Sequence, residues 1–183
     1  MTTETFFRIA LPSDQAHIGP LLHKVYFKEA PPTNEIEHAE NEILVQKRLQ
    51  DIFLNKEGCM FIAENEGKPI GLSYVKPDQR RKGWIVDDLH TLPEYEGQGV
   101  GSQLLKMCED FVHKQGQTQI HLSVELDKLG NVNFYEKRGY LKQMFKESAD
   151  KDPQNPRTHL MVKTFSSDDL PQKNNTTQEN HLT

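Results

Sequence analysis

The chain contains 183 residues, carries a formal net charge of −5 and has only two cysteines. A chain of this length can form one domain with a full hydrophobic core, and its negative charge argues against non-specific binding to nucleic acid. Residues 1–4 lead straight into a strand-like run instead of a signal peptide, and no apolar run approaches the roughly 20 residues of a membrane helix. We therefore expect a soluble, cytoplasmic protein with no membrane contact, in which Cys59 and Cys108 are reduced, buried thiols.

The first 55 residues predict one strand followed by two helices. Residues 6–11 form a short apolar run, and residues 12–14 read Pro-Ser-Asp, a typical helix start. The first helix contains Gly19 and Pro20, which should kink or delay it. A second helix is expected over residues 34–55, with an inner face formed by Ile36, Ile43, Leu44, Ile52 and Phe53.

Acidic residues mark the beginning of the second helix. The helix dipole favours negative charge at that end, and the sequence places four glutamates there: Glu35, Glu37, Glu40 and Glu42. We interpret them as a solvated face, with an acidic recognition surface as the alternative.

The middle of the chain predicts three strands and then a glycine-rich turn into a helix. Residues 59–64 and 70–76 form a hairpin around residues 65–68 by composition. Residues 84–92 are apolar and rich in β-branched side chains, and Pro93 ends that strand. Helical spacing then begins at Val100, and its apolar positions are Val100, Leu104, Leu105, Cys108, Phe111 and Val112.

The turn between this strand and helix contains Gly97, Gly99 and Gly101. A helix start leaves backbone N–H groups without partners, and glycines let an anion come close to them. The spacing matches neither the dinucleotide fingerprint nor a Walker A loop. The turn therefore predicts an anion site of another kind, with an ordinary tight turn as the alternative.

The last part of the chain predicts a strand, a short helix and a closing strand pair. Residues 119–124 alternate apolar and polar side chains, and a short helix ends at Gly139, which suits a left-handed C-cap. Residues 140–145 and 158–165 form the closing pair around a long exposed loop. We expect a single domain over residues 1–165 and a disordered polar tail over residues 166–183.

Two stretches carry a resemblance to a known family. Residues 89–95 (Leu-His-Thr-Leu-Pro-Glu-Tyr) and 96–101 (Glu-Gly-Gln-Gly-Val-Gly) resemble the acetyl-CoA loop of the GNAT superfamily of N-acetyltransferases, and residues 134–140 (Phe-Tyr-Glu-Lys-Arg-Gly-Tyr) resemble its second signature. Over about residues 5–165 the resemblance implies an α/β (α+β) fold, a mixed and mostly antiparallel sheet flanked by helices, in the order β-α-α-β-β-β-α-β-α-β-β. Two residues depart from the family pattern: Glu96 replaces a Gln or Arg, and Lys128 replaces an Asn.

The resemblance also implies a cofactor site. It places the pantetheine arm of acetyl-CoA along Leu89, His90 and Thr91, where an N–H near Leu89 could hold a developing oxyanion. Glu96 is expected to point to solvent, and Asn131 could replace the missing family Asn. The pyrophosphate is expected on Gly97, Gln98, Gly99, Val100, Gly101 and Ser102.

Catalysis would need an acid and a base. Tyr135 matches the family tyrosine that protonates the departing thiolate, with a core aromatic as the alternative. Asp87 is the preferred base, since a carboxylate inside an apolar strand is costly without a role, although a bulge in the strand would change which side chains share a face. The alternatives are Asp88, His90, His121 and Glu125. No metal is expected, because the histidines and cysteines show no ligand spacing.

The function that these expectations imply is acetyl transfer from acetyl-CoA to a primary amine by direct attack in a ternary complex. The acceptor, a small molecule or a protein amine, is not specified; the acidic second helix favours a cationic molecule or lysine. Nucleic acid is not expected as a partner, and a homodimer is left open. The alternatives are an acyl-CoA-binding regulatory domain without turnover, which Glu96 and Lys128 keep open, and a protein that binds another nucleotide.

Overall fold

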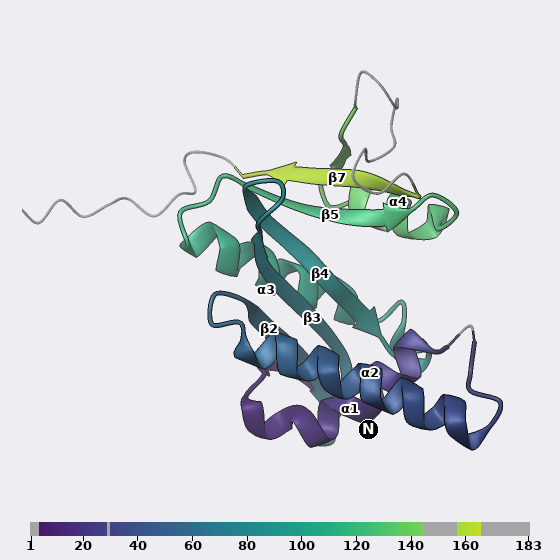
Figure 1. The fold of residues 1–183 in the computed structure, drawn as a ribbon. Helices are drawn as coiled ribbons and strands as arrows, with labels where there is room; N and C mark the ends of the chain where they lie inside the picture. The colour runs from purple at the N-terminus through teal and green to yellow at the C-terminus, as the bar shows by residue number, and fades with distance from the viewer. Residues whose placement is uncertain (1–3, 29, 145–156, 166–183) are drawn as a thin grey trace, which may run out of the picture.

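The computed structural model describes residues 4–28, 30–144 and 157–165 (Figure 1). Within these ranges, seven strands form one sheet in the order β1-β2-β3-β4-β5-β7-β6. The strands are β1 (Thr5–Ile9), β2 (Cys59–Asn65), β3 (Lys68–Asp78), β4 (Gly83–Thr91), β5 (Gln119–Glu125), β6 (Leu141–Lys142) and β7 (Thr158–Thr164). The helices are α1 (Gln15–Tyr26), α2 (Glu35–Leu54), α3 (Val100–Lys114) and α4 (Leu129–Glu136), with short 3-10 turns at Pro12–Asp14 and Pro93–Tyr95. The element order and the mostly antiparallel sheet confirm the predicted fold class.

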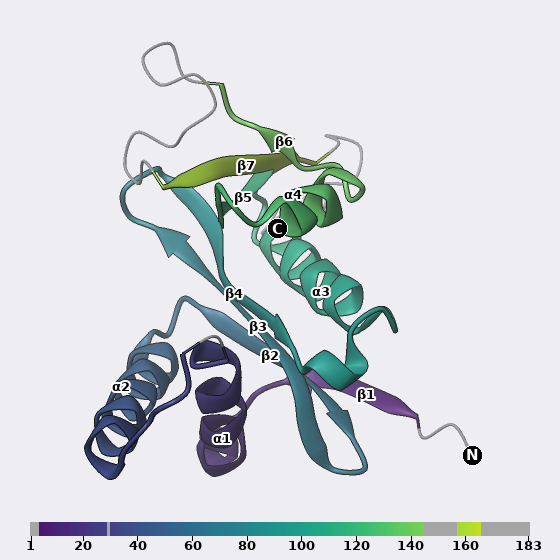
Figure 2. The same cartoon turned by 90° about the vertical axis from the view of Figure 1, so that its right-hand side faces the viewer.

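The helices cover the two faces of the sheet, α1 and α2 on one face and α3 and α4 on the other (Figure 2). Each face has its own buried core. One core joins α1 and α2 to β2 and β3 and includes Leu22, Leu49 and Leu72, and the other packs α3 on the sheet through Leu104 and Leu105. Gly71 allows close packing of α3, because a Cβ at this position would lie 3.1 Å from Leu104 Cδ1 and 3.2 Å from Val100 Cγ1.

Helix α2 corrects the predicted inner face. Ile52 is buried as expected, but Ile36, Ile43 and Leu44 are 73%, 67% and 57% exposed. The reason is helical geometry: at about 100° per residue, Ile43 lies about 180° around the helix from Ile52. The buried stripe instead consists of Val45, Leu49 and Ile52.

The tight turns follow the predictions more closely, whereas Gly19 and Pro20 do not delay helix α1, which already begins at Gln15. Pro20 lies inside α1 and is exposed, and the helix continues to Tyr26. The β2–β3 hairpin turns through Glu66 and Gly67, both with positive φ, which is the geometry of a turn that matches the twist of the strands. Gly139 has a φ of 85° and ends α4 as expected. The predicted loop over residues 146–157 lies almost entirely outside the described residues, and the predicted tail over residues 166–183 lies wholly outside them.

Strand β4 contains a bulge at Asp87. Val86 pairs with Val75 and Asp88 pairs with the adjacent Tyr74, so Asp87 is the extra residue. A bulge of this kind turns two consecutive side chains to one side of the sheet. Asp87 and Asp88 accordingly both contact Arg48 on α2.

Strands β4 and β5 separate soon after they meet. They run parallel and pair at Ile85 and His121, the one register position described between them. Figures 1 and 2 show the two strands diverging from this point. The rest of β4, up to Thr91, therefore has an open edge on the side of β5.

Candidate functional site

Two cavities meet at the open edge of β4. The first, of about 490 Å³, is lined by the glycine turn, the start of α3 and one side of α4, and we call it the glycine-loop cavity. The second, of about 710 Å³, lies between β4 and the end of α1, and we call it the lysine cavity after Lys24, Lys28 and Lys128. Four residues line both cavities: Leu89, Thr91, Glu96 and Asn131. The two cavities therefore adjoin each other at β4.

The glycine-loop cavity ends at the first turn of α3. Gly99 is the N-cap residue, with a φ of 86°, and it provides no side chain to cap the helix. The first N–H groups of α3 therefore remain available to a ligand. A Cβ at Gly97 or Gly99 would meet nothing within 4 Å, so the space in front of the turn is open. These features fit the phosphates of an extended cofactor.

Arg138 adds a positive charge to this cavity, and the sequence analysis did not assign it a role. Its guanidinium donates to Ser102 Oγ and, at 2.6 Å, to the carbonyl oxygen of Phe134, and it stacks 3.6 Å above the Phe134 ring. A cation held at a helix start complements an anionic ligand. The signal in the sequence was the i, i+4 spacing to Phe134, which places both residues on one face of α4 and its C-cap.

Most of the predicted cofactor residues line this cavity, but Gln98 and His90 do not, and His90 lines the lysine cavity instead. Gln98 turns away, because its side-chain amide donates to the carbonyl oxygen of Glu94 at 2.9 Å. The Glu96 side chain is 60% exposed, in line with the expectation that it points to solvent, and it also lines both cavities and lies 3.6 Å from Lys28 Nζ. The predicted residues that line the glycine-loop cavity are Leu89, Thr91, Gly97, Gly99, Val100, Gly101, Ser102 and Asn131.

The backbone of β4 presents donors to the open edge. The N–H of Leu92 bonds to the carbonyl oxygen of Ile70 on β3 at 2.8 Å. Because backbone N–H groups alternate along a strand, those of Leu89 and Thr91 point away from β3, toward the gap left by β5. The structure thus puts an N–H of Leu89 where the sequence analysis expected an oxyanion donor.

Tyr135 lines the glycine-loop cavity from α4. Its ring packs edge-on against Phe134 and Tyr140, with centroids 5.1 and 5.7 Å away. Burial raises the pKa of Tyr135 to about 12. The phenol is therefore protonated at neutral pH, as a proton donor must be.

His90 lines the lysine cavity and is held by Asp88. Its Nε2 lies 3.3 Å from Asp88 Oδ1, and the same oxygen accepts a hydrogen bond of 2.8 Å from the Tyr26 hydroxyl. Burial alone would raise the pKa of Asp88, but the hydrogen bond from His90 and the charge of Arg48 hold it below its usual value. An ionised Asp88 can only accept, so Nε2 of His90 carries the hydrogen and Nδ1 of the neutral ring can take up a proton.

Asp87, the preferred base, lies elsewhere. Its Oδ2 is 2.5 Å from Arg48 Nη2 and 2.6 Å from Lys76 Nζ, and it lines a separate depression together with Lys76 and Arg80. Two cations thus engage this carboxylate away from the cavity that contains Tyr135. Sequence reasoning missed this arrangement because Arg48 is 39 residues distant from Asp87 along the chain.

Neither of the other two candidate bases lines the glycine-loop cavity or the lysine cavity. His121 Nε2 lies 2.8 Å from Asp78 Oδ2 and is buried near Gly83, at the opposite end of β4 from Thr91. Glu125 is exposed at the end of β5.

The thiols are free, with Cys59 partly buried and Cys108 buried. Burial raises the pKa of Cys59 to about 11 and that of Cys108 to about 12, which disfavours the reactive thiolate. Within the described residues, no group of three or more His, Cys, Asp and Glu side chains could hold a metal ion. No helix in the described ranges is long and apolar enough to cross a membrane.

Comparisons with known proteins converge on one family. The profile of the acetyltransferase (GNAT) family matches residues 22–140. The uncharacterized N-acetyltransferase YhfO of Bacillus subtilis is 27% identical over 139 residues, which cover 73% of this chain and 87% of YhfO. N-alpha-acetyltransferase 30 of Schizosaccharomyces pombe is 31% identical over 84 residues, covering 44% of this chain and 55% of that protein.

Solved structures share the same fold. The PaiA N-acetyltransferase of Thermoplasma acidophilum, crystallised in complex with coenzyme A, superposes with a TM-score of 0.69 at 17% identity. The superposition covers 88% of this chain and 99% of PaiA. At this level of identity the likeness concerns the fold alone.

Proposed function

The chain belongs to the acetyltransferase (GNAT) family and is an N-acetyltransferase, and from that premise we propose that it transfers an acetyl group from acetyl-CoA to a primary amine by direct attack in a ternary complex. The observation that carries the proposal is the pair of contiguous cavities at the open edge of β4. One cavity suits the phosphates of a cofactor and contains a proton donor. The other contains a histidine able to accept a proton.

We assign the cofactor to the glycine-loop cavity. The first turn of α3 and Arg138 complement its phosphates, and the glycines leave room for their approach. The open edge of β4 provides backbone N–H groups at Leu89 and Thr91 for the pantetheine arm, as an added strand would. Asn131 lines both cavities, which supports a role for it in place of the missing family Asn.

Bound acetyl-CoA would supply a thioester, whose acetyl group is activated for transfer to an amine. The N–H of Leu89 polarises the carbonyl oxygen; in comparable sites one such donor is worth about 3 kcal/mol. Tyr135 Oη donates a proton to the leaving sulfur. We propose His90, not Asp87, as the base, because Nδ1 of His90 can take a proton from the amine while Asp88 holds the ring.

The proposal can be tested by thermal unfolding with acetyl-CoA, CoA, NAD and ATP, followed by a thiol-release assay with a panel of amines. A ligand at a hundred times its dissociation constant adds about 2.7 kcal/mol of stability, and for a domain of this size we expect a shift of about 5–11 °C. Acetyl-CoA and CoA alone should produce it.

Tyr135→Phe is the matching variant. It should lower thiol release by about 100-fold or more, the usual contribution of a positioned proton donor, and retain the thermal shift with CoA. Turnover at the wild-type level would remove Tyr135 as the acid. A shift with NAD or ATP alone would contradict the cofactor assignment, and a shift with CoA but no release from any amine would favour a binding domain.

A further inference from the structure

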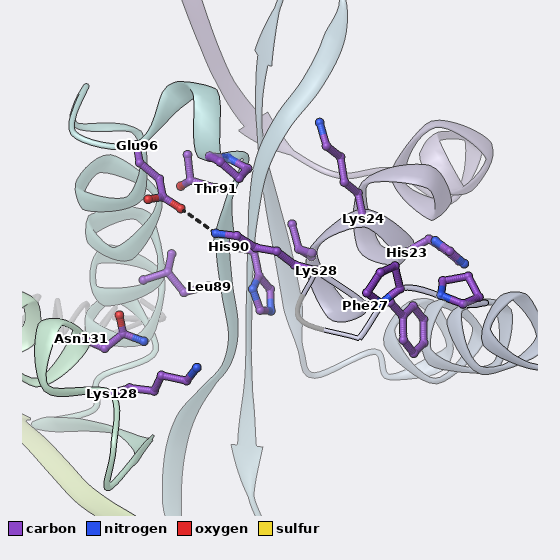
Figure 3. Close-up of a pocket in the computed structure, with 14 residues that line it drawn as sticks. His23, Lys24, Phe27, Lys28, Leu89, His90, Thr91, Glu96, Lys128 and Asn131 are labelled. Carbon is purple, nitrogen blue, oxygen red and sulfur yellow. Dashed lines mark ion pairs between the residues drawn. The ribbon is translucent and has the colours of Figure 1, made fainter. Parts of the chain in front are cut away.

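The lysine cavity is lined by more positive than negative side chains. Lys24 and Lys28 come from the end of α1 and the residues that follow it, and Lys128 comes from the turn before α4. Glu96 is the one carboxylate among the described residues that line this cavity. Figure 3 shows Lys28 reaching from the α1 side toward Glu96, with Lys128 on the opposite side of the cavity beside Asn131.

The acidic start of α2 does not contribute to this cavity. Glu35, Glu37, Glu40 and Glu42 are exposed and none of them lines the cavity, so among its described lining residues a cationic acceptor would meet Glu96 as the one carboxylate. The mainly positive lining of the cavity therefore does not complement the cationic acceptor that the sequence alone favoured.

We propose that the acceptor is a small amine that also carries an anionic group, a carboxylate or a phosphate, and that Lys24 and Lys28 bind this group. The inference rests on the proposed function and names the substrate class of that site. A polycation is disfavoured, because like charges repel in the cavity.

The two lysines can exchange their present partners for such a group. Lys24 Nζ lies 2.9 Å from Glu94 Oε1 and Lys28 Nζ lies 3.6 Å from Glu96 Oε1, and the four side chains are all more than half exposed. Exposed ion pairs contribute little stability. An anion held between two lysines gains more, since charge-assisted hydrogen bonds from two donors converge on it.

The same lysines also favour the reactive form of the acceptor. Acetyl transfer needs a neutral amine, and nearby positive charge lowers the pKa of an ammonium group. The anionic group of the acceptor would therefore bind the lysines, and the amine would lie beside His90, which lines the same cavity.

These lysines are distinct from the proposed phosphate site of the cofactor. Arg138 and the first turn of α3 line the glycine-loop cavity, whereas Lys24 and Lys28 line only the lysine cavity. They also lie on the α1 side of β4 (Figure 3). The inference therefore predicts an effect on the KM of the acceptor and not on that of acetyl-CoA.

The test uses the full chain and matched amines that differ in the anion: γ-aminobutyrate against butylamine, aminoethyl phosphate against ethanolamine, and spermidine as the polycation. Thiol release should show a kcat/KM at least about tenfold higher for an anionic amine than for its neutral partner. The first pair reports a carboxylate preference and the second a phosphate preference. Added salt should reduce the advantage, since it screens exposed charges.

Lys24→Gln and Lys28→Gln should each raise the KM of the anionic amine about fivefold and leave that of the neutral partner unchanged. Lys106→Gln is the matched control, because Lys106 is an exposed lysine paired with Asp110 on α3, outside both cavities. Lys106→Gln should change neither the KM of the anionic amine nor that of its neutral partner.

Four outcomes would overturn the inference. Neutral amines or spermidine could react with a kcat/KM equal to that of the anionic amines. The lysine variants could instead raise the KM of acetyl-CoA. The variants could also leave the preference for the anion intact. If no amine in the panel reacts, calorimetry with the CoA-bound protein decides, and equal binding of γ-aminobutyrate and butylamine contradicts the inference. Failure of the proposed function would look different, since acetyl-CoA would then not stabilise the protein, or CoA would bind without thiol release from any amine, anionic or not.

Discussion

At the scale of single residues, the site depends on the partners of the two adjacent carboxylates of β4. Asp87 is held by two cations, Arg48 and Lys76, whereas Asp88 holds His90 toward the lysine cavity. The bulge turns both carboxylates toward α2, where they share Arg48, and they differ in their other partners.

We therefore expect His90→Gln to lower kcat by about 100-fold or more, the usual contribution of a general base. Asp87→Asn should lower kcat only a few-fold, because its carboxylate lies in another depression.

Steady-state kinetics of the two variants and the wild type, with CoA binding measured in parallel, would check this assignment. The opposite ranking of the two variants, with CoA binding unchanged in both, would return the role of base to Asp87.

At the residue scale, the sequence predicted residues that lie in short motifs but not those whose partners are distant in the chain. The glycine turn, Tyr135 and Gly139 were predicted because each lies in a short contiguous motif. Arg48, Lys24 and Lys28 were not assigned roles, because their partners are distant in the chain and no local pattern connects them.

At the scale of elements, the junction of β4 and α3 holds the proposed cofactor site. The turn places Gly99 at the N-cap in the left-handed region, where glycine is tolerated without strain. Its lack of a side chain leaves the first turn of α3 open to a ligand.

Gly99→Val should therefore weaken CoA binding by about tenfold or more, which corresponds to about 1.4 kcal/mol. Gly116→Val is the matched control, since Gly116 follows α3, has a φ of 74° and also has open space in front of it. Both variants should lose about 1–2 kcal/mol of unfolding free energy from backbone strain, but only Gly99→Val should affect the cofactor.

Calorimetric titration with CoA and urea unfolding of both variants separate the two effects. Equal CoA affinity in Gly99→Val and the wild type would contradict the assignment of the turn.

Element boundaries were predicted well where the sequence has clear capping residues. Asn34 and Asn55 flank α2 as expected, and the Asn34 side chain accepts a hydrogen bond from the N–H of Glu37. The face of α2 was predicted wrongly, because Ile36 and Ile43 are apolar yet lie outside the buried stripe. Hydrophobicity alone does not reveal which side of a long helix meets the sheet, since α2 carries apolar residues around much of its circumference.

At the scale of the whole molecule, Arg48 connects the layer of α1 and α2 to the strand that carries the site. It binds Asp87 and Asp88, and its guanidinium lies 5.5 Å from the centre of the Tyr74 ring. Burial opposes the charge of Arg48, but the two carboxylates raise its pKa above the usual value. The pair is partly desolvated, so removal of one partner should be costly.

Arg48→Met should lower the free energy of unfolding by about 3 kcal/mol at pH 7, because it leaves a buried carboxylate without its cation. In the wild type, the pKa of Asp88 is lowered by folding. Its contribution to stability is therefore present above the unfolded pKa of about 3.9 and is lost as the pH falls through the lower folded value.

Urea unfolding at pH 7, 5 and 3 would measure this effect. The variant should lose less stability than the wild type on acidification, and Lys106→Met should resemble the wild type because its ion pair is exposed. A loss below about 0.5 kcal/mol for Arg48→Met at pH 7 would contradict the structural role of the network.

The bulge at Asp87 has a consequence for how the length of this strand can vary. Removing one residue from a central strand normally reverses the face of every side chain beyond it. Here Val86 and Asp88 already pair with the adjacent residues Val75 and Tyr74, so a chain lacking Asp87 would keep the pairing of every later residue in β4. Leu89 and Thr91 would still line the glycine-loop cavity, and His90 the lysine cavity. The middle of the sheet therefore contains one position at which a single-residue deletion preserves the site, at the cost of the contacts of Asp87 with Lys76 and Arg48.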